Sequence, residues 1–392
     1  MYFYNYCSGT YVRQMDIPYR TAFANNMNIE RDKMMGDISP AGNKTVENVM
    51  SNRSPYAPPH ILLLCVSDQC DFSCQMCTYR PGRLQEVMTL DDWKTLIDET
   101  LPSDVEYSLF GGEPLLYKEI DELVSYIGNL NAKINIVTNG YYLEEHVDVL
   151  MENNCNITLS IDGLGHSHDI VRGREGSFAR IEKTLAKIMR TYPDEKIDKI
   201  NVNSVLLPEN AGHVGELIDY LYGIGVTNVA FQHLQFFDEK DQKETDHIWR
   251  EFCRRPFDVL LTPRKKYDFT HEDIEKIRKA VKEIHKCHVR YPDMNIYIFP
   301  DLSIDEIALY YSEDHGKLMN KSLCLYPWSS ATISVDGNIS LCLGALIGNY
   351  KKQNFWSAWY GQEAVRFREQ VISNFFPVCT RCCNFYNTYI PD

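Results

Sequence analysis

Three cysteines, Cys70, Cys74 and Cys77, fall within eight residues directly after an apolar run at 61–66. The run predicts a buried strand, so the three thiolates would stand on one loop at the exit of that strand. Thiolates are soft metal ligands, and three of them on so short a loop suit an iron-sulfur cluster. A four-iron cluster needs one ligand for each iron. One iron would therefore stay open to an outside chelator, normally a small molecule that carries an amine and a carboxylate.

Two other interpretations of this loop compete with the iron-sulfur cluster. A structural zinc site needs four ligands in a tetrahedron, and the nearest other cysteine, Cys65, lies within the expected strand. Zinc therefore fits poorly. Free cysteines are also common in protein cores, but three on a polar loop do not form a core pattern.

A second group of cysteines lies near the end of the chain. Cys324 and Cys342 flank an Asp-Gly-Asn sequence set between alternating apolar residues, a pattern typical of a hairpin. Four thiolates from a hairpin and a CxxC turn would ligate a cluster fully, and a zinc ribbon could use the same ligands. Three more cysteines could complete the set: Cys379, Cys382 and Cys383. The other cysteines have no partner at metal spacing and are expected to pack in the core: Cys7, Cys65, Cys155, Cys253 and Cys287.

Small and polar residues follow other expected strands, at the end where parallel-sheet enzymes place ligands. Gly111 and Gly112 would let backbone approach a ligand closely. The adjacent Glu113 carboxylate could accept a charge-assisted hydrogen bond from an ammonium group. Asn139 lies in a Thr-Asn-Gly sequence that predicts a turn.

The strand expected near 156–161 also ends in polar residues. Ser160 and Asp162 would point to the same face, because side chains alternate along a strand. His168 and Asp169 follow, and we expect a solvated loop there rather than catalysis. At the exit of a later strand, two polar residues are expected only to bond their neighbours: His233 and Gln235.

Elements that could position these residues alternate from 60 to about 236. Strands are expected near 61–66, 105–110, 133–138, 156–161, 199–206 and 227–234. Helices are expected to begin near 90, 117, 143, 177 and 212, with Thr89 and Ser177 as candidate N-caps. Six strands separated by helices predict an α/β fold with a parallel sheet and right-handed crossovers.

The chain divides into four expected segments. Residues 1–59 show no sustained period and predict an arm or cap, and residues 60–236 hold the alternating strands and helices. Residues 237–320 are charged and mostly helical, which predicts an insert or bridge. In residues 321–392, Gly, aromatic and Cys residues replace the alternation, which predicts a small domain held by metal.

The composition is that of a globular protein, with 392 residues of which 44% are hydrophobic. The 54 acidic and 40 basic residues give a net charge of −14, which argues against nucleic acid and anionic membranes as partners. No apolar run approaches the roughly 20 residues of a membrane helix, and no secretion signal is recognisable at the N-terminus. Thirteen cysteines in such a chain favour metal ligands over disulfides, so we expect a soluble, cytoplasmic protein.

The CxxxCxxC loop resembles the signature of the radical S-adenosylmethionine (radical SAM) enzymes. Met76 stands where that family usually has an aromatic residue before the third cysteine. The resemblance implies a partial six-stranded, TIM-like (β/α) barrel. It also implies a 4Fe-4S cluster on Cys70, Cys74 and Cys77, whose open iron is chelated by S-adenosyl-L-methionine. An electron from this cluster would cleave that molecule to methionine and a 5'-deoxyadenosyl radical.

The cysteines near the C-terminus resemble the SPASM or twitch extension of the same family. The resemblance implies a small iron-sulfur domain with one auxiliary 4Fe-4S cluster, since the further cysteines of a full SPASM pattern do not follow Cys383. The implied ligands are Cys324, Cys342, Cys379 and Cys382, with Cys383 as the alternative to Cys382.

The resemblance also assigns residues to S-adenosylmethionine. The segment Gly111-Gly112-Glu113 would bind its amino group, and Asn139 would lie near its adenosine. Ser160 and Arg172 would hold its carboxylate, with Arg172 as a bidentate fork. Asp162 would meet the ribose or the substrate.

The implied function is that of a radical SAM oxidoreductase. By analogy with single-cluster relatives, we expect dehydrogenation of a small polar, sugar- or cyclitol-like metabolite, assisted by the auxiliary cluster. An electron donor such as flavodoxin or ferredoxin would reduce the enzyme. The alternative is a maturase that crosslinks or epimerises a ribosomal peptide. An alternative of another class is a non-catalytic iron-sulfur or zinc protein, which would make no radical.

Overall fold

The computed structural model describes residues 2–5, 10–13, 58–77, 87–192, 199–253, 262–263, 268–321, 324, 326–342, 344–373 and 375–382. One curved sheet organises most of them, in the order β11-β8-β7-β6-β5-β4-β3-β12-β13-β14. Its strands are β3 (Ile61–Ser67), β4 (Glu106–Gly111), β5 (Lys133–Thr138), β6 (Asn156–Ser160), β7 (Ile200–Leu206), β8 (Asn228–His233), β11 (Asn295–Phe299), β12 (Ser330–Ile333), β13 (Asn338–Ser340) and β14 (Leu346–Asn349).

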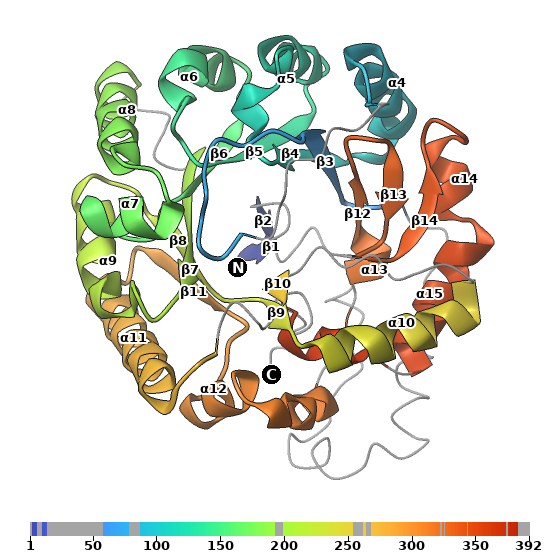
Figure 1. Ribbon diagram of the computed structural model, residues 1–392. Helices are drawn as coiled ribbons and strands as arrows, with labels where there is room; N and C mark the ends of the chain where they lie inside the picture. The colour runs from blue at the N-terminus through green and yellow to red at the C-terminus, as the bar shows by residue number, and fades with distance from the viewer. Residues whose placement is uncertain are drawn as a thin grey trace, which may run out of the picture.

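Helices between these strands cover the convex face of the sheet, as Figure 1 shows. They are α4 (Leu90–Thr100), α5 (Ile120–Asn129), α6 (Leu143–Glu152), α8 (Ser177–Thr191), α9 (Val214–Gly223) and α11 (His271–Arg290). The short helix α7 (His166–Arg172) follows β6 and ends beside the cysteine loop. Alternate strand residues such as Leu62, Ile136 and Val202 pack with these helices in one hydrophobic core. The intervening residues therefore point to the concave side, because side chains alternate along a strand.

The six strands expected from the sequence are all present, and every neighbouring pair from β3 to β8 is parallel. This confirms the α/β fold with a mostly parallel sheet. The sheet is open, as expected for a partial barrel.

The sheet is nevertheless larger than the alternating pattern indicates. The range 237–320, expected to be mostly helical, contains β11, which continues the sheet in parallel beside β8. On the other side β12 lies parallel to β3, and β13 and β14 follow in antiparallel pairing. The sequence pattern missed β11 because it follows the long charged helices α10 (Glu239–Cys253) and α11 instead of a regular strand-helix repeat.

The C-terminal part completes the fold with α12 (Ile304–Tyr310), α13 (Tyr326–Ser329), α14 (Phe355–Trp359) and α15 (Gln362–Ser373). The expected hairpin is confirmed, because β12 and β13 are joined by a turn in which Gly337 adopts a φ of +82°. In the arm expected at 1–59, the structure describes one antiparallel pair, β1 (Tyr2–Asn5) with β2 (Thr10–Arg13). The four expected domain limits stay a prediction.

Helix starts show one confirmed cap and one correction. Thr89 is the N-cap of α4 and forms a capping box with Asp92. Ser177 is not a cap. It is the first residue of α8, where the Asp169 carboxylate accepts hydrogen bonds from the backbone N–H of Gly176 and Phe178 at 2.7 and 2.9 Å. A carboxylate in this place satisfies amide groups that a helix leaves unpaired at its start.

No described helix combines the length and the hydropathy that a membrane-spanning segment requires.

Candidate active site

The cysteine loop leaves the carboxyl end of β3, as its sequence predicts. Burial raises the pKa of Cys70 to about 11, and the nearby Glu113, Cys74 and Cys77 add to this increase. Such mutual effects require the three thiols to lie close together. Three converging thiols match the donor set of an iron-sulfur cluster with one open iron, so these residues fit the group that the family implies.

The segment Gly111-Gly112-Glu113 lies against the chain that leads into this loop. The backbone N–H of Gly112 donates to the Ser67 carbonyl at 2.9 Å, and that of Glu113 donates to the Gln69 carbonyl at 2.7 Å. Gly111 has a φ of +149°, and a Cβ there would collide with the Ser67 carbonyl oxygen. The absent side chain of Gly111 therefore permits the close approach of β4 to β3, and the expected approach of a ligand to this glycine stays a prediction.

The Glu113 carboxylate is buried and joins two strand ends. It accepts hydrogen bonds from the Thr138 hydroxyl at 2.6 Å and from the backbone N–H of Asn139 at 2.8 Å and Leu115 at 3.1 Å. Burial raises the pKa of Glu113 to about 7, although these three bonds oppose the increase. In the structure Glu113 thus holds the turn after β5, and its expected contact with an ammonium group stays a prediction.

Asn139 offers an unused donor at this position. Its backbone N–H and its Oδ1 are both engaged, the latter by the backbone N–H of Tyr141 at 2.9 Å. Its side-chain Nδ2 is buried and has no hydrogen-bond partner in the part of the chain that the structure describes. A buried donor without a partner costs stability unless a ligand supplies an acceptor, which agrees with the expected place of Asn139 near a cofactor.

Asp162 and Arg172 form a buried ion pair beside the cysteine loop. Arg172 Nε lies 2.5 Å from Asp162 Oδ2, and the two side chains are 12% and 0% exposed. Asp162 also accepts a hydrogen bond from the backbone N–H of Val205 at 2.7 Å. Arg172 Nη1 points at Cys74 Sγ, 3.9 Å away. Asp162 therefore orients Arg172, and its expected contact with ribose or substrate stays a prediction.

His168 corrects another expectation. The sequence places it in a solvated loop, but in α7 it is fully buried and its Nδ1 accepts a hydrogen bond from the backbone N–H of Asp162 at 3.2 Å. Burial, together with the nearby Arg172, lowers the pKa of His168 to about 3. His168 is therefore neutral at physiological pH and supports the backbone at Asp162.

The concave side of the sheet carries a belt of polar residues at the level of Asn135. Asn135 Nδ2 donates to the Ser108 hydroxyl, and Asn135 Oδ1 accepts from the Thr158 hydroxyl, both at 3.0 Å. Across the sheet, Asn295 Nδ2 donates to Asn228 Oδ1 at 2.7 Å. The strand pairing continues this level through Asn201, whose buried Oδ1 has no hydrogen-bond partner among the described residues. The amides and hydroxyls of Asn135, Ser108 and Thr158 are buried, and their hydrogen bonds join neighbouring strands of the sheet.

The four cysteines expected to hold the auxiliary cluster also converge. Burial raises the pKa of Cys379 well above its usual value, and Cys324, Cys382 and Cys342 raise it further. The backbone N–H of Cys382 donates to the Cys379 carbonyl at 3.1 Å, which closes the CxxC turn. The structure does not describe Cys383, so it cannot be compared with Cys382 here.

This second site lies at the opposite end of β3 from the first. Cys324 and Cys342 pack against a cluster of Ile61, Leu63 and Tyr326, and β12, which begins a few residues after Tyr326, pairs its first residue with Ile61. The cysteine loop leaves the other end of β3. Seven residues separate these ends, or about 20 Å at about 3.3 Å per residue.

Arg381 is a residue of the second site whose role the sequence did not reveal. It stands within the CxxC turn, is almost fully buried, and donates to the backbone carbonyls of Tyr310 at 2.8 Å and Ser312 at 2.7 Å. Its Nη1 also lies 3.3 Å from an Asp241 carboxylate oxygen. Thus Arg381 attaches the cysteine turn to α12 and α10. An arginine between two cysteines of a CxxC is the signal that could have drawn attention to it.

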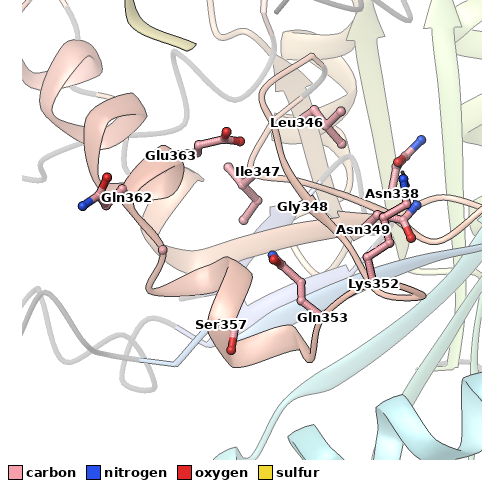
Figure 2. A pocket seen from close by; sticks show the side chains of 11 residues that line it. Asn338, Leu346, Ile347, Gly348, Asn349, Lys352, Gln353, Ser357, Gln362 and Glu363 are labelled. Carbon is pink, nitrogen blue, oxygen red and sulfur yellow. Dashed lines mark hydrogen bonds between the residues drawn. The ribbon is translucent and has the colours of Figure 1, made fainter. Parts of the chain in front are cut away.

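The described residues also line a pocket of about 570 Å³ at the edge of the sheet. Figure 2 shows Ile347 of β14 beside Glu363 of α15, with Asn349 of β14 and Gln353 farther along the same pocket. No cysteine lines it, so it belongs to neither cysteine site.

The sheet is parallel and barrel-like, with a three-cysteine loop at one strand exit and a four-cysteine site beyond it. This arrangement defines a class of iron-sulfur enzymes. Residues 64–221 match the model of the Radical SAM superfamily, and residues 324–383 match the SPASM iron-sulfur cluster-binding domain. The chain therefore belongs to the radical SAM superfamily and carries a C-terminal SPASM domain. Membership implies 4Fe-4S clusters and S-adenosylmethionine as cofactors and confirms iron-sulfur over zinc.

Two curated relatives illustrate the range of this similarity. The sporulation killing factor maturation protein SkfB of Bacillus subtilis is 27% identical over 164 residues, which are 41% of this chain and 39% of that protein. The PqqA peptide cyclase of Rhizobium meliloti is 22% identical over 83% of this chain and 80% of its own length. The chain thus spans less than half the length of SkfB.

Among solved structures, Streptococcus suis SuiB bound to its precursor peptide SuiA has a similar fold. The TM-score is 0.57 at 16% identity, over 87% of this chain and 75% of that one. This similarity confirms the fold.

Proposed function

We propose that this protein is a radical SAM enzyme that modifies a peptide. The observation that carries the proposal is the similarity to a PqqA peptide cyclase, which extends over 83% of the chain. SkfB, a maturation protein by its name, and the fold shared with peptide-bound SuiB support the same substrate class. These relatives favour the peptide alternative over the sugar- or cyclitol-like metabolite that we expected first.

The two cysteine sites lie at opposite ends of β3, so a peptide segment on the concave side would lie between them.

In this proposal Cys70, Cys74 and Cys77 hold one cluster, and Cys324, Cys342, Cys379 and Cys382 hold the other. When bound, the first cluster with S-adenosylmethionine supplies a radical that removes a hydrogen atom from the substrate. The protein binds and orients the cofactor and excludes water, while the cofactor provides the chemistry. An external one-electron donor of the flavodoxin or ferredoxin class would reduce the enzyme.

Other residues of the first site would position S-adenosylmethionine. Asn139 Nδ2 and Ser160 are available to its polar groups, and Arg172 would face its carboxylate. Gly111, Gly112 and Glu113, which lie against the chain that leads into the cysteine loop, would bind its amino group.

The experiment is to express the protein together with each short open reading frame found beside its gene and to measure the peptide masses. We expect one peptide to change mass with the wild-type protein and to stay unchanged with Cys74→Ala. The same peptide should raise 5'-deoxyadenosine formation by purified, anaerobically reduced enzyme. A cyclitol or sugar that raises it while no peptide does would contradict the proposal.

A further inference from the structure

The end of α7 fits closely against the cysteine loop. The backbone N–H of Gln75 donates to the Val171 carbonyl at 2.9 Å. Gly173, with a φ of +63°, lies so near the loop that a Cβ there would be 2.5 Å from the Ser73 carbonyl oxygen. A glycine is required at this contact, both for the left-handed backbone and for the space. The loop and the helix end therefore act as one rigid unit around Cys74.

Arg172 stands between these two contacts. Its Nη1 donates toward Cys74 Sγ at 3.9 Å, and its Nε is paired with Asp162 at 2.5 Å. Asp162 is itself fixed, because its carboxylate accepts from Val205 N–H at 2.7 Å and its carbonyl accepts from Asn210 Nδ2 at 3.0 Å. The guanidinium is planar and forks, so its orientation follows from these two contacts.

Hydrogen bonds and positive charge at a cluster sulfur favour the reduced state, which carries one more negative charge than the oxidised state. We propose that Arg172, held by Asp162, raises the reduction potential of the cluster at Cys70, Cys74 and Cys77 through its contact with Cys74 Sγ. This inference depends on the ligand set given under the proposed function. It is separate from the expected binding of the S-adenosylmethionine carboxylate, because it acts before that molecule binds.

The test is a redox titration of the reconstituted, full-length protein without S-adenosylmethionine, followed by electron paramagnetic resonance. Subtraction of the Cys74→Ala spectrum isolates the signal of this cluster from the auxiliary one. Arg172→Gln should make reduction at least tenfold less favourable, which is about 59 mV for a one-electron couple. Arg172→Lys keeps the charge but loses the fork, so its potential should fall between those of Arg172→Gln and the wild type.

Arg174→Gln is the matched control. Arg174 is also an arginine beside the loop, but it pairs with Asp71 at 3.5 Å and stacks on Tyr141, and its side chain is 37% exposed. Arg174→Gln removes the same positive charge, but Arg174 has no described contact with a cluster sulfur. The reduction potential of the cluster should therefore change by less than half as much in Arg174→Gln as in Arg172→Gln.

The inference is overturned if Arg172→Gln has the wild-type potential, or if Arg174→Gln shifts it equally. Iron and sulfide analysis shows whether each variant holds the cluster. Failure of both Arg172 variants to assemble it would also overturn the inference, because Arg172 would then serve assembly. No substrate enters the titration, so its result does not depend on whether a peptide is the substrate.

Discussion

The two cysteine sites of this protein are built in different ways. Cys70, Cys74 and Cys77 leave one strand on one short loop, which the end of α7, the segment after β4 and Tyr142 hold in place. The auxiliary cysteines stand at 324, 342, 379 and 382, and they meet only because β12 pairs with β3 and because Arg381 attaches the CxxC turn to α10 and α12. The first site is a local structure, whereas the second is a product of the whole fold.

Because the two sites are built differently, their loss should affect different properties of the protein. The first loop lies at the strand exit, and Cys77 is exposed there. Around the second site, three of its cysteines raise the pKa of the fourth, Cys379, on top of the effect of burial. Loss of the first site should therefore remove activity, while loss of the second should remove stability.

The largest effect is expected for Cys74→Ala. The first cluster needs all three cysteines, so reduced protein should form no detectable 5'-deoxyadenosine and should lose about half of its iron. Product and iron are measured after anaerobic reconstitution. Cys155→Ala, at a buried cysteine outside both sites, is the control and should keep both. Product from Cys74→Ala would remove the loop from the active site.

Cys379→Ala should separate the two sites. It removes a ligand of the auxiliary cluster, so about half of the iron should be lost while cleavage of S-adenosylmethionine continues. Limited proteolysis should then cut the region 324–382 faster than in Cys74→Ala, because metal binding stabilises this region. If Cys379→Ala abolishes 5'-deoxyadenosine formation, the two sites are not independent.

Cys382→Ala and Cys383→Ala are a matched pair of neighbouring substitutions. Cys382 contributes to the raised pKa of Cys379, so it lies near the other ligands. We expect loss of auxiliary iron with Cys382→Ala and full iron with Cys383→Ala. The reverse result would assign Cys383 as the fourth ligand.

Arg381→Met tests the attachment of the second site to the barrel. It leaves Asp241 in a buried position without its arginine, which should lower stability by about 3–5 kcal/mol. The readout is the thermal unfolding midpoint. Lys317→Gln, which breaks an exposed pair with Asp314, should change stability by less than about 1 kcal/mol. Equal midpoints for the two variants would show that Arg381 is not an anchor.

The smallest effect concerns His233, which bonds the Tyr311 hydroxyl at 2.9 Å between the barrel and α12. Burial lowers the pKa of His233 to about 3. Below pH 6.5 the unfolded chain takes up a proton that the folded chain excludes, so stability falls as the pH falls from 6.5 toward 3.

At pH 5 this loss is about 2 kcal/mol, at about 1.4 kcal/mol for each pH unit below 6.5. His233→Gln should therefore show a smaller drop of the unfolding midpoint between pH 7 and pH 5 than the wild type. His213→Gln, at an exposed histidine, should behave like the wild type. If the unfolding midpoint of His233→Gln falls as far between pH 7 and pH 5 as that of the wild type, then His233 is protonated in the folded protein.

Several features of this protein could be predicted because they depend on residues that are close together in the sequence. The spacing of Cys70, Cys74 and Cys77, the period of the strands from β3 to β8, and the cap at Thr89 each depend on neighbours in the sequence. Such signals can be recognised in one sequence because nearby residues determine where loops, strands and helices begin.

Other features depend on partners far away along the chain. Nothing beside Asp162 or His168 in the sequence shows that one would orient Arg172 and the other would be buried, and nothing beside β11 shows that β8 would accept it as a neighbour. Burial and strand pairing arise when distant segments pack, and they set which polar groups face each other. The two groups of cysteines could therefore be recognised from the order of the residues, whereas the surroundings of these cysteines follow from packing.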